Sequence, residues 1–343
     1  MQLVFHDSVH HIQSLVSRGQ RDCPASSLKI FGQPLIVRNI RVASSFLDID
    51  KVMIPESFSH ISKLVQDNFP SIDVEEFSDY CYINKNLNTK TSDDYCQWLQ
   101  SMTTSRLIKK DVSYINEGRL EIPLNTFIDY HYTRRGKVGQ DTASPPPHLL
   151  IDTFIYPWDF LRIIQKVLCD NIRETVISPN ASIAKSSIIE GPCIIEDNVT
   201  IDDFCKIKGP TYIGNGSFIG MGSLIRNCML GEKTNIGFNC EIAKSYFAGC
   251  DKMAHQNVIL DSIIGEDVWF GGYSGTANVL LNKQNIRYEV DGKLLDTGTN
   301  HFGAVVGNNC AVGAAVIILP GRQVPSYSLI QAGTIFGKSK KSE

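Results

Sequence analysis

The sequence predicts two parts of different fold class, an α/β part at the N-terminus and an all-β coil of short parallel strands, a β-helix, at the C-terminus. Three observations lead to this prediction. Apolar segments of strand and helix length alternate in the first half, isoleucine recurs every six residues in the second, and the proline run Ser144–Pro147 separates them. We expect an α/β domain at 1–150, a linker helix at 151–175 and a β-helix at 176–343.

The first half alternates strand and helix patterns, which is typical of a parallel, Rossmann-like sheet. We predict strands at 1–5, 50–54 and 71–77, with helices at 34–45 and 57–69. The linker helix is predicted to begin at Tyr156-Pro157 and to run to about Asp170, because proline is favoured in the first turn of a helix.

The six-residue series begins at Ile177, continues with occasional five-residue steps to Phe270, and resumes from Val306 to Phe336. This period fits neither an α-helix nor a long two-residue alternation. Three such segments complete one triangular coil, in which the apolar residues stack inside and glycine or asparagine turns the corners. The polar stretch at about 279–303 interrupts the series and is expected to project as a loop.

Composition excludes several classes of protein. Lys plus Arg number 33 and Asp plus Glu 36, and no basic run is long enough to follow a nucleic-acid backbone. No stretch approaches the ~20 apolar residues that cross a bilayer, so we expect neither nucleic acid nor membrane as a partner and a cytoplasmic location. The 10 cysteines contain no Cys-x-x-Cys pair, so we expect buried, reduced thiols and no metal.

The two halves together resemble the sugar-1-phosphate nucleotidyltransferases that carry a C-terminal left-handed parallel β-helix, and the handedness is implied by this resemblance. The segment Phe31–Ile36 is similar to the Gly-Lys-Pro-Leu-Ile segment of that family. However, the first strand runs into His6–His11, which lacks the glycine-rich loop that wraps nucleotide phosphates in active members. We therefore expect the first 150 residues to form a shortened, degenerate nucleotidyltransferase-like domain.

Within the repeats, Lys252–Asp261 and Phe270–Asn278 resemble the acetyltransferase site of the bifunctional glucosamine-1-phosphate acetyltransferases. The resemblance implies that His255 is the general base, that the Gly272 amide stabilises the oxyanion and that Asn278 contacts acceptor and acyl donor. Histidine suits the first role because an ammonium group must lose a proton before its nitrogen attacks a thioester.

The same resemblance implies further contacts. Residues Gly303–Pro320 are similar to the coils that face coenzyme A, and the implied cofactor-binding residues are Gly272, Ala311, Gly313 and Ala314. We also expect Lys244, Asn257 and Arg287 to contact the substrate, with Arg287 on the polar insertion as a replacement anion contact. Lys244 lies one residue beyond the family's sugar-phosphate lysine and Val258 replaces an acceptor-binding tyrosine, so we expect a changed acceptor. The resemblance also implies a homotrimer with coenzyme A between subunits.

The leading hypothesis is an acyltransferase that transfers an acetyl or other acyl group from acyl-CoA to an amino group of a sugar, a sugar phosphate or a related small molecule, without a metal. Two alternatives stay open. The N-terminal domain would make the protein a sugar-1-phosphate nucleotidyltransferase, or the β-helix would serve a non-catalytic trimeric scaffold or regulatory subunit. Each predicted site residue also has a structural alternative, since histidine, asparagine and glycine all occur at β-helix corners.

Overall fold

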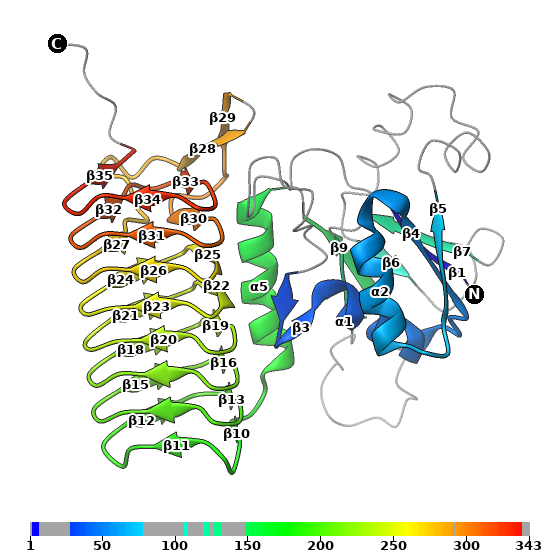
Figure 1. Ribbon diagram of the computed structural model, residues 1–343, viewed down its shortest axis with the longest axis horizontal. Helices are drawn as coiled ribbons and strands as arrows, with labels where there is room; N and C mark the ends of the chain where they lie inside the picture. Colours follow the sequence, from blue (N-terminus) through cyan, green and yellow to red (C-terminus); the bar gives the residue numbers. More distant parts are fainter. Residues whose placement is uncertain are drawn as a thin grey trace, which may run out of the picture. The chain divides into compact units, whose positions relative to one another are not determined.

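The computed structural model (Figure 1) describes the residues in the ranges 2–6, 28–77, 106–108, 119–123, 126–131, 148–154, 156–290 and 292–337. They form two compact units. The first unit contains the α/β elements up to residue 155, and the second contains residues 29–32 and everything from Tyr156 onward. The segment after His6 and the connector Ser144–Pro147 lie outside the described residues.

The first unit is built on a parallel sheet, as the alternating pattern predicts. Its strand order is β5 (Asp73–Phe77), β4 (Lys51–Pro55), β1 (Gln2–His6) and β7 (Arg119–Pro123). The helices are α1 (Leu35–Phe46) and α2 (Ser59–Asn68), the latter preceded by the 3-10 turn η3 (Glu56–Phe58). Leu3, Val52, Ile40 and Ile61 are fully buried between sheet and helices, so the predicted α/β core is confirmed.

A second, antiparallel sheet in this unit was not predicted. Its order is β6 (Arg106–Ile108), β9 (His148–Thr153) and β8 (Thr126–His131). Helix α1 holds β8 through Arg38, which donates to the Ile128 carbonyl at 2.6 Å, and through Asn39, which accepts the Ile128 N–H at 3.0 Å. Two short strands, β2 (Lys29–Ile30) and β3 (Gln33–Pro34), precede α1.

The second unit is a left-handed parallel β-helix with three faces of eight strands each. The first face contains β10 (Val176–Ile177), β13 (Cys193–Ile195), β16 (Thr211–Ile213), β19 (Met229–Leu230), β22 (Tyr246–Gly249), β25 (Ile263–Glu266), β30 (Ala304–Val306) and β33 (Arg322–Val324). The second face contains β11 (Ser182–Ile183), β14 (Thr200–Ile201), β17 (Phe218–Ile219), β20 (Asn235–Ile236), β23 (Lys252–Met253), β26 (Trp269–Phe270), β31 (Ala311–Val312) and β34 (Leu329–Ile330). The third face contains β12 (Ile188–Glu190), β15 (Lys206–Lys208), β18 (Leu224–Arg226), β21 (Glu241–Ala243), β24 (Val258–Leu260), β27 (Gly275–Thr276), β32 (Ile317–Ile318) and β35 (Ile335–Phe336).

The predicted six-residue series forms the interior of this prism. On the second face, Ile219, Ile236, Met253 and Phe270 pair in register from one coil to the next, and each is almost completely buried. Each coil therefore buries its apolar residue against the coils before and after it, which explains why the period is so regular. Of the described cysteines, Cys193, Cys205, Cys228, Cys240 and Cys310 are buried as expected, whereas Cys169 is exposed.

Helix α5 (Pro157–Asn171) packs along the first face of the prism, where its Phe160 ring meets Tyr246 at 5.0 Å (Figure 1). The polar insertion after β27 is more ordered than the projecting loop that we expected. It contains a hairpin of β28 (Arg287–Val290) and β29 (Lys293–Asp296), and Tyr288 is buried between Phe302 and Trp158 of α5. Apolar residues spaced within the polar stretch anchor it. No helix among the described residues is long and apolar enough to span a membrane.

Candidate active site at one corner of the prism

His255 lies at the corner where the second face turns into the third, two residues after the buried Met253. Because Ile219, Ile236, Met253, Phe270 and Val312 are in register, the residues two positions after them form a column along this corner. The column contains Met221, Phe238, His255, Gly272 and Ala314. The structure therefore brings the predicted base and the predicted oxyanion donor into consecutive coils.

Backbone hydrogen bonds join each corner to the next. The His255 carbonyl accepts the Tyr273 N–H at 2.9 Å, and the Gly272 carbonyl accepts the Ala315 N–H at 2.9 Å. A side chain at position 272 would place its Cβ 3.4 Å from the His255 carbonyl oxygen, which is ordinary contact. Glycine is therefore not needed here for the coils to stack.

A ladder of small polar side chains supports this corner from inside. Ser223 donates to the Gly237 carbonyl at 2.9 Å, and its hydroxyl accepts the Cys240 N–H at 3.0 Å. Asn257 continues the ladder in the coil after Cys240. Ser274 continues it in the coil after Asn257 and donates to the Gly313 carbonyl at 2.7 Å. Buried carbonyl and amide groups at the corner are thereby satisfied, which keeps the turn rigid.

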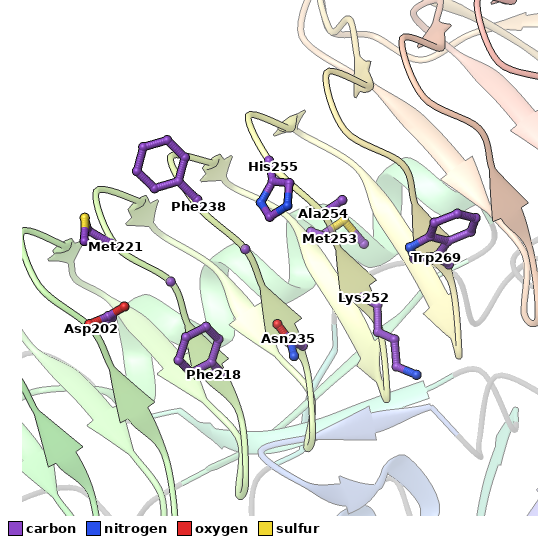
Figure 2. Close-up of a pocket in the computed structure, with 12 residues that line it drawn as sticks. Asp202, Phe218, Met221, Asn235, Phe238, Lys252, Met253, Ala254, His255 and Trp269 are labelled. Carbon is purple, nitrogen blue, oxygen red and sulfur yellow. The ribbon is translucent and has the colours of Figure 1, made fainter.

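The outer side of the corner forms a groove of about 500 Å³ on the second face, which we name the trough. Figure 2 shows its two rows of side chains, one from the strands and one from the corner. The strand row is Phe218, Asn235, Lys252 and Trp269, and the corner row is Met221, Phe238 and His255. Between the rows run Gly220, Gly237 and Ala254, and Asp202 lies at the end away from Trp269.

His255 is exposed, and among the described residues its imidazole has no hydrogen-bond partner. In the same part of the chain, no acceptor is found for the Gly272 N–H. A base whose nitrogens are free and an amide donor in the next coil are the groups that acyl transfer requires. At this corner they are available to a bound molecule.

Three of the predicted cofactor-binding residues lie in the coil above Gly272. Ala311 pairs in register with Trp269, and Ala314 continues the corner column. A Cβ on Gly313 would come within 2.5 Å of the Ala332 nitrogen, so close stacking of the coils requires glycine there. These three residues follow the trough in the C-terminal direction but are not part of its lining.

Asn278 and Lys244 occupy a different corner, where the third face turns into the first. Asn278 donates through Nδ2 to the Asp261 carboxylate at 2.6 Å, and its carbonyl accepts the Phe302 N–H at 3.0 Å. Lys244 is exposed one coil below Asp261. A complete third-face strand separates this corner from His255, so one chain alone does not bring these predicted residues together.

The expected contact between Asn257 and substrate is wrong. Its side chain is fully buried, and its Nδ2 donates to the carbonyls of Gly271 at 2.7 Å and Ser274 at 3.1 Å. A ligand cannot reach an amide that is already paired inside the prism. Arg287 lies exposed on the hairpin of the insertion, away from the trough lining, and Val258 is exposed on the third face.

Sequence reasoning missed the aromatic lining of the trough. Phe218 and Trp269 precede buried core residues, so they point outward, and Phe238 and Met221 stand at corners where most coils carry small or polar residues. Large apolar residues at outward positions of the six-residue series were the available signal. The described residues contain no group of three or more His, Cys, Asp or Glu side chains that would hold a metal ion.

Comparison with known proteins supports the expected resemblance. Residues 171–284 match the family model of the GMPPB C-terminal domain. The bifunctional sugar-1-phosphate nucleotidylyltransferase/acetyltransferase of Sulfurisphaera tokodaii is 33% identical over 184 residues, which cover 53% of this chain and 45% of that protein. The bifunctional protein GlmU of Methanococcus vannielii is 34% identical over 188 residues, covering 54% and 44%.

Among solved structures, a putative acetyltransferase of Bacillus cereus matches with 20% identity and a TM-score of 0.25, covering 43% of this chain and 71% of that one. The chain spans less than half the length of the curated relatives described above.

Proposed function

We propose that this relative of the bifunctional sugar-1-phosphate nucleotidylyltransferase/acetyltransferases is an acyltransferase that uses acyl-CoA to acylate an amino group of a sugar, a sugar phosphate or a related small molecule. One observation carries the proposal. Among the described residues, the exposed His255 imidazole and the Gly272 N–H lie at the same corner in consecutive coils, and neither has a hydrogen-bond partner. The names of the relatives support acyl transfer as the reaction class.

The proposed reaction is a direct transfer. The neutral amine nitrogen of the acceptor attacks the thioester carbonyl, a C–N bond forms, and the carbonyl oxygen becomes an oxyanion that the Gly272 N–H stabilises. His255 takes the proton that the nitrogen loses. The C–S bond then breaks, coenzyme A leaves as a thiolate, and the proton on His255 is available to that leaving thiolate. No metal takes part in these steps.

We further propose that a homotrimer completes the site. Asn278 and Lys244 lie at another corner of the same prism, so they reach His255 only from a neighbouring copy. Flat prism faces suit a closed cyclic assembly, in which one corner of each subunit faces a different corner of the next. Asn278, held by Asp261, would then contact the acceptor beside the imidazole of the adjacent subunit.

The test is thiol release from acetyl-CoA with a panel of amino sugars and amino-sugar phosphates as acceptors, followed by mass spectrometry of the product. His255→Ala should lower kcat by about 10²–10⁴ without a change in thermal stability, because the residue is exposed and unpaired. His60→Ala, an exposed histidine on α2, is the matched control and should retain the activity of the parent protein.

Equal turnover by the parent protein and His255→Ala would reject the proposed mechanism. If no amine acceptor is acylated but nucleoside triphosphate and a sugar phosphate release pyrophosphate, the nucleotidyltransferase alternative replaces the proposal. If neither reaction occurs, the non-catalytic scaffold alternative replaces the proposal.

A further inference from the structure

We propose that the trough on the N-terminal side of His255 holds the alkyl part of the acyl donor, so that the donor carries a medium-length chain of about eight to ten carbons rather than acetyl. This inference rests on the proposed function and goes beyond it by assigning the donor class.

The shape of the trough fits a linear, unbranched ligand. Its floor is nearly free of side chains, since it consists of Gly220, Gly237 and the methyl group of Ala254. Coil stacking enforces this, because a Cβ on Gly237 would lie 1.7 Å from the Ala254 carbonyl oxygen and one on Gly220 would lie 2.8 Å from Gly237 backbone. The result is an open groove that crosses consecutive coils parallel to the prism axis.

The chemistry of the walls favours an apolar ligand. On the N-terminal side of His255, Met221 and Phe238 are 41% and 47% exposed, and Phe218 lines the same groove. Trp269, 51% exposed, lies in the coil after His255, where the thioester end of the donor would lie. Apolar side chains gathered in one groove at this level of exposure are typical of a binding site. Lys252 stands in the strand row, where its methylene stem adds apolar wall while its ammonium reaches water.

The length of the channel sets the expected chain. Adjacent coils are ~4.8 Å apart, so the three steps from the His255 coil to the Asp202 coil span about 14 Å. An extended alkyl chain advances about 1.25 Å per carbon, so about 14 Å corresponds to about eleven carbons, and a chain of about eight to ten carbons ends before Asp202. Asp202 ends the groove with a carboxylate, where an alkyl chain would lose its apolar contacts.

The direction of the donor agrees with this assignment. The predicted coenzyme A residues Ala311, Gly313 and Ala314 lie on the C-terminal side of His255, and the trough continues on the N-terminal side. A donor whose thioester carbonyl lies at His255 and Gly272 therefore extends its pantetheine arm one way and its alkyl chain the other. The bond changes are those of the proposed reaction, and the product is a medium-chain amide.

The test measures binding and so needs no acceptor. Isothermal titration calorimetry of the full chain with coenzyme A, acetyl-CoA, hexanoyl-CoA, octanoyl-CoA and decanoyl-CoA gives Kd for each. A fully buried methylene strengthens binding about fourfold, so even partial burial of six additional methylenes should make octanoyl-CoA bind at least about tenfold more tightly than acetyl-CoA. Saturation should occur at one molecule per chain.

Three variants distinguish binding of the alkyl chain in the trough from nonspecific hydrophobic binding elsewhere on the surface. Phe238→Ala should lower the ratio of octanoyl-CoA to acetyl-CoA affinity by about fivefold or more, since one apolar wall is lost. Met221→Trp should fill the far end of the channel and move the preferred chain from decanoyl towards hexanoyl. Ile188→Ala removes an exposed apolar side chain from β12 on the third face and should leave every Kd unchanged.

Equal affinity for acetyl-CoA and octanoyl-CoA, with acetyl transfer observed, would overturn this inference and leave the proposed function intact. So would an equal effect of Ile188→Ala and Phe238→Ala. If no CoA thioester binds, the proposed function itself fails, and the two failures are thereby distinguished.

Discussion

Asn257 allows a decisive test of the corner structure, because the sequence suggested a substrate contact and the structure shows a buried support. Its Nδ2 donates to the carbonyls of Gly271 and Ser274, which begin and end the turn that carries Gly272. In Asn257→Ala, the Gly271 carbonyl loses its hydrogen-bond donor while buried, at a cost of about 1–3 kcal/mol. The second bond contributes about 0.5–1.5 kcal/mol. We expect the free energy of unfolding to fall by about 2–4 kcal/mol.

Asn257→Asp tests the donor role without a change of shape. A carboxylate there would place oxygen against two carbonyl oxygens, now 2.7 and 3.1 Å from the amide nitrogen. We therefore expect a greater loss of stability at neutral pH than in Asn257→Ala, and partial recovery in acid, where the protonated carboxyl donates one hydrogen bond.

Urea unfolding monitored by circular dichroism gives the global stability, and hydrogen exchange of residues 270–276 reports the local opening of the turn. Asn235→Ala, an exposed asparagine on β20, is the matched control and should change stability by less than about 0.5 kcal/mol. If Asn257→Ala unfolds like the parent protein but loses acyl-CoA binding or turnover tenfold or more, the assignment of Asn257 to structural support is refuted.

Two further predictions concern buried groups. Burial raises the pKa of the Cys228 thiol from 9.0 to about 12, so the folded state keeps a proton that the unfolded state releases. The stability that the protonated thiol contributes is complete below pH 9 and is lost as the pH rises towards 12, at up to ~1.4 kcal/mol per pH unit. In Cys228→Ala, stability should therefore fall less steeply with alkaline pH, as measured by urea unfolding midpoints over a pH series. The buried Tyr288 hydroxyl has no hydrogen-bond partner among the described residues, so Tyr288→Phe should raise the thermal midpoint and increase stability by about 1 kcal/mol, whereas Tyr288→Ala should lose about 3–5 kcal/mol. A lower stability in Tyr288→Phe would mean that the hydroxyl is paired.

Much of the fold could be predicted because its determinants are local and repeated. Each coil of the prism obeys the same rule, an apolar residue inside and a turn residue at the corner, so Ile219, Ile236 and Phe270 disclose the architecture without reference to distant segments. In the first unit, strand and helix lengths predicted α1, α2 and the parallel strands β1, β4 and β5, but not the fourth strand β7. The antiparallel sheet of β6, β8 and β9 was missed because it depends on long-range pairing of short segments.

The candidate site divides along the same line. The sequence by itself indicated that His255 and Gly272 lie one coil apart, because the 17 residues from one to the other equal three steps of the apolar series. Ala314 lies beyond the insertion, and only the register of Phe270 with Val312 places it at the same corner. Only the tertiary structure decided which side chains face outward and which are already paired. In the structure, Asn257 points inward and donates to two carbonyls, Asn278 lies at a different corner from His255, and a trough with aromatic walls lies beside His255. Periodicity determines the position of a residue on its coil. Its burial and its hydrogen bonds depend on the neighbouring coils, and they decide whether its side chain is available to a ligand.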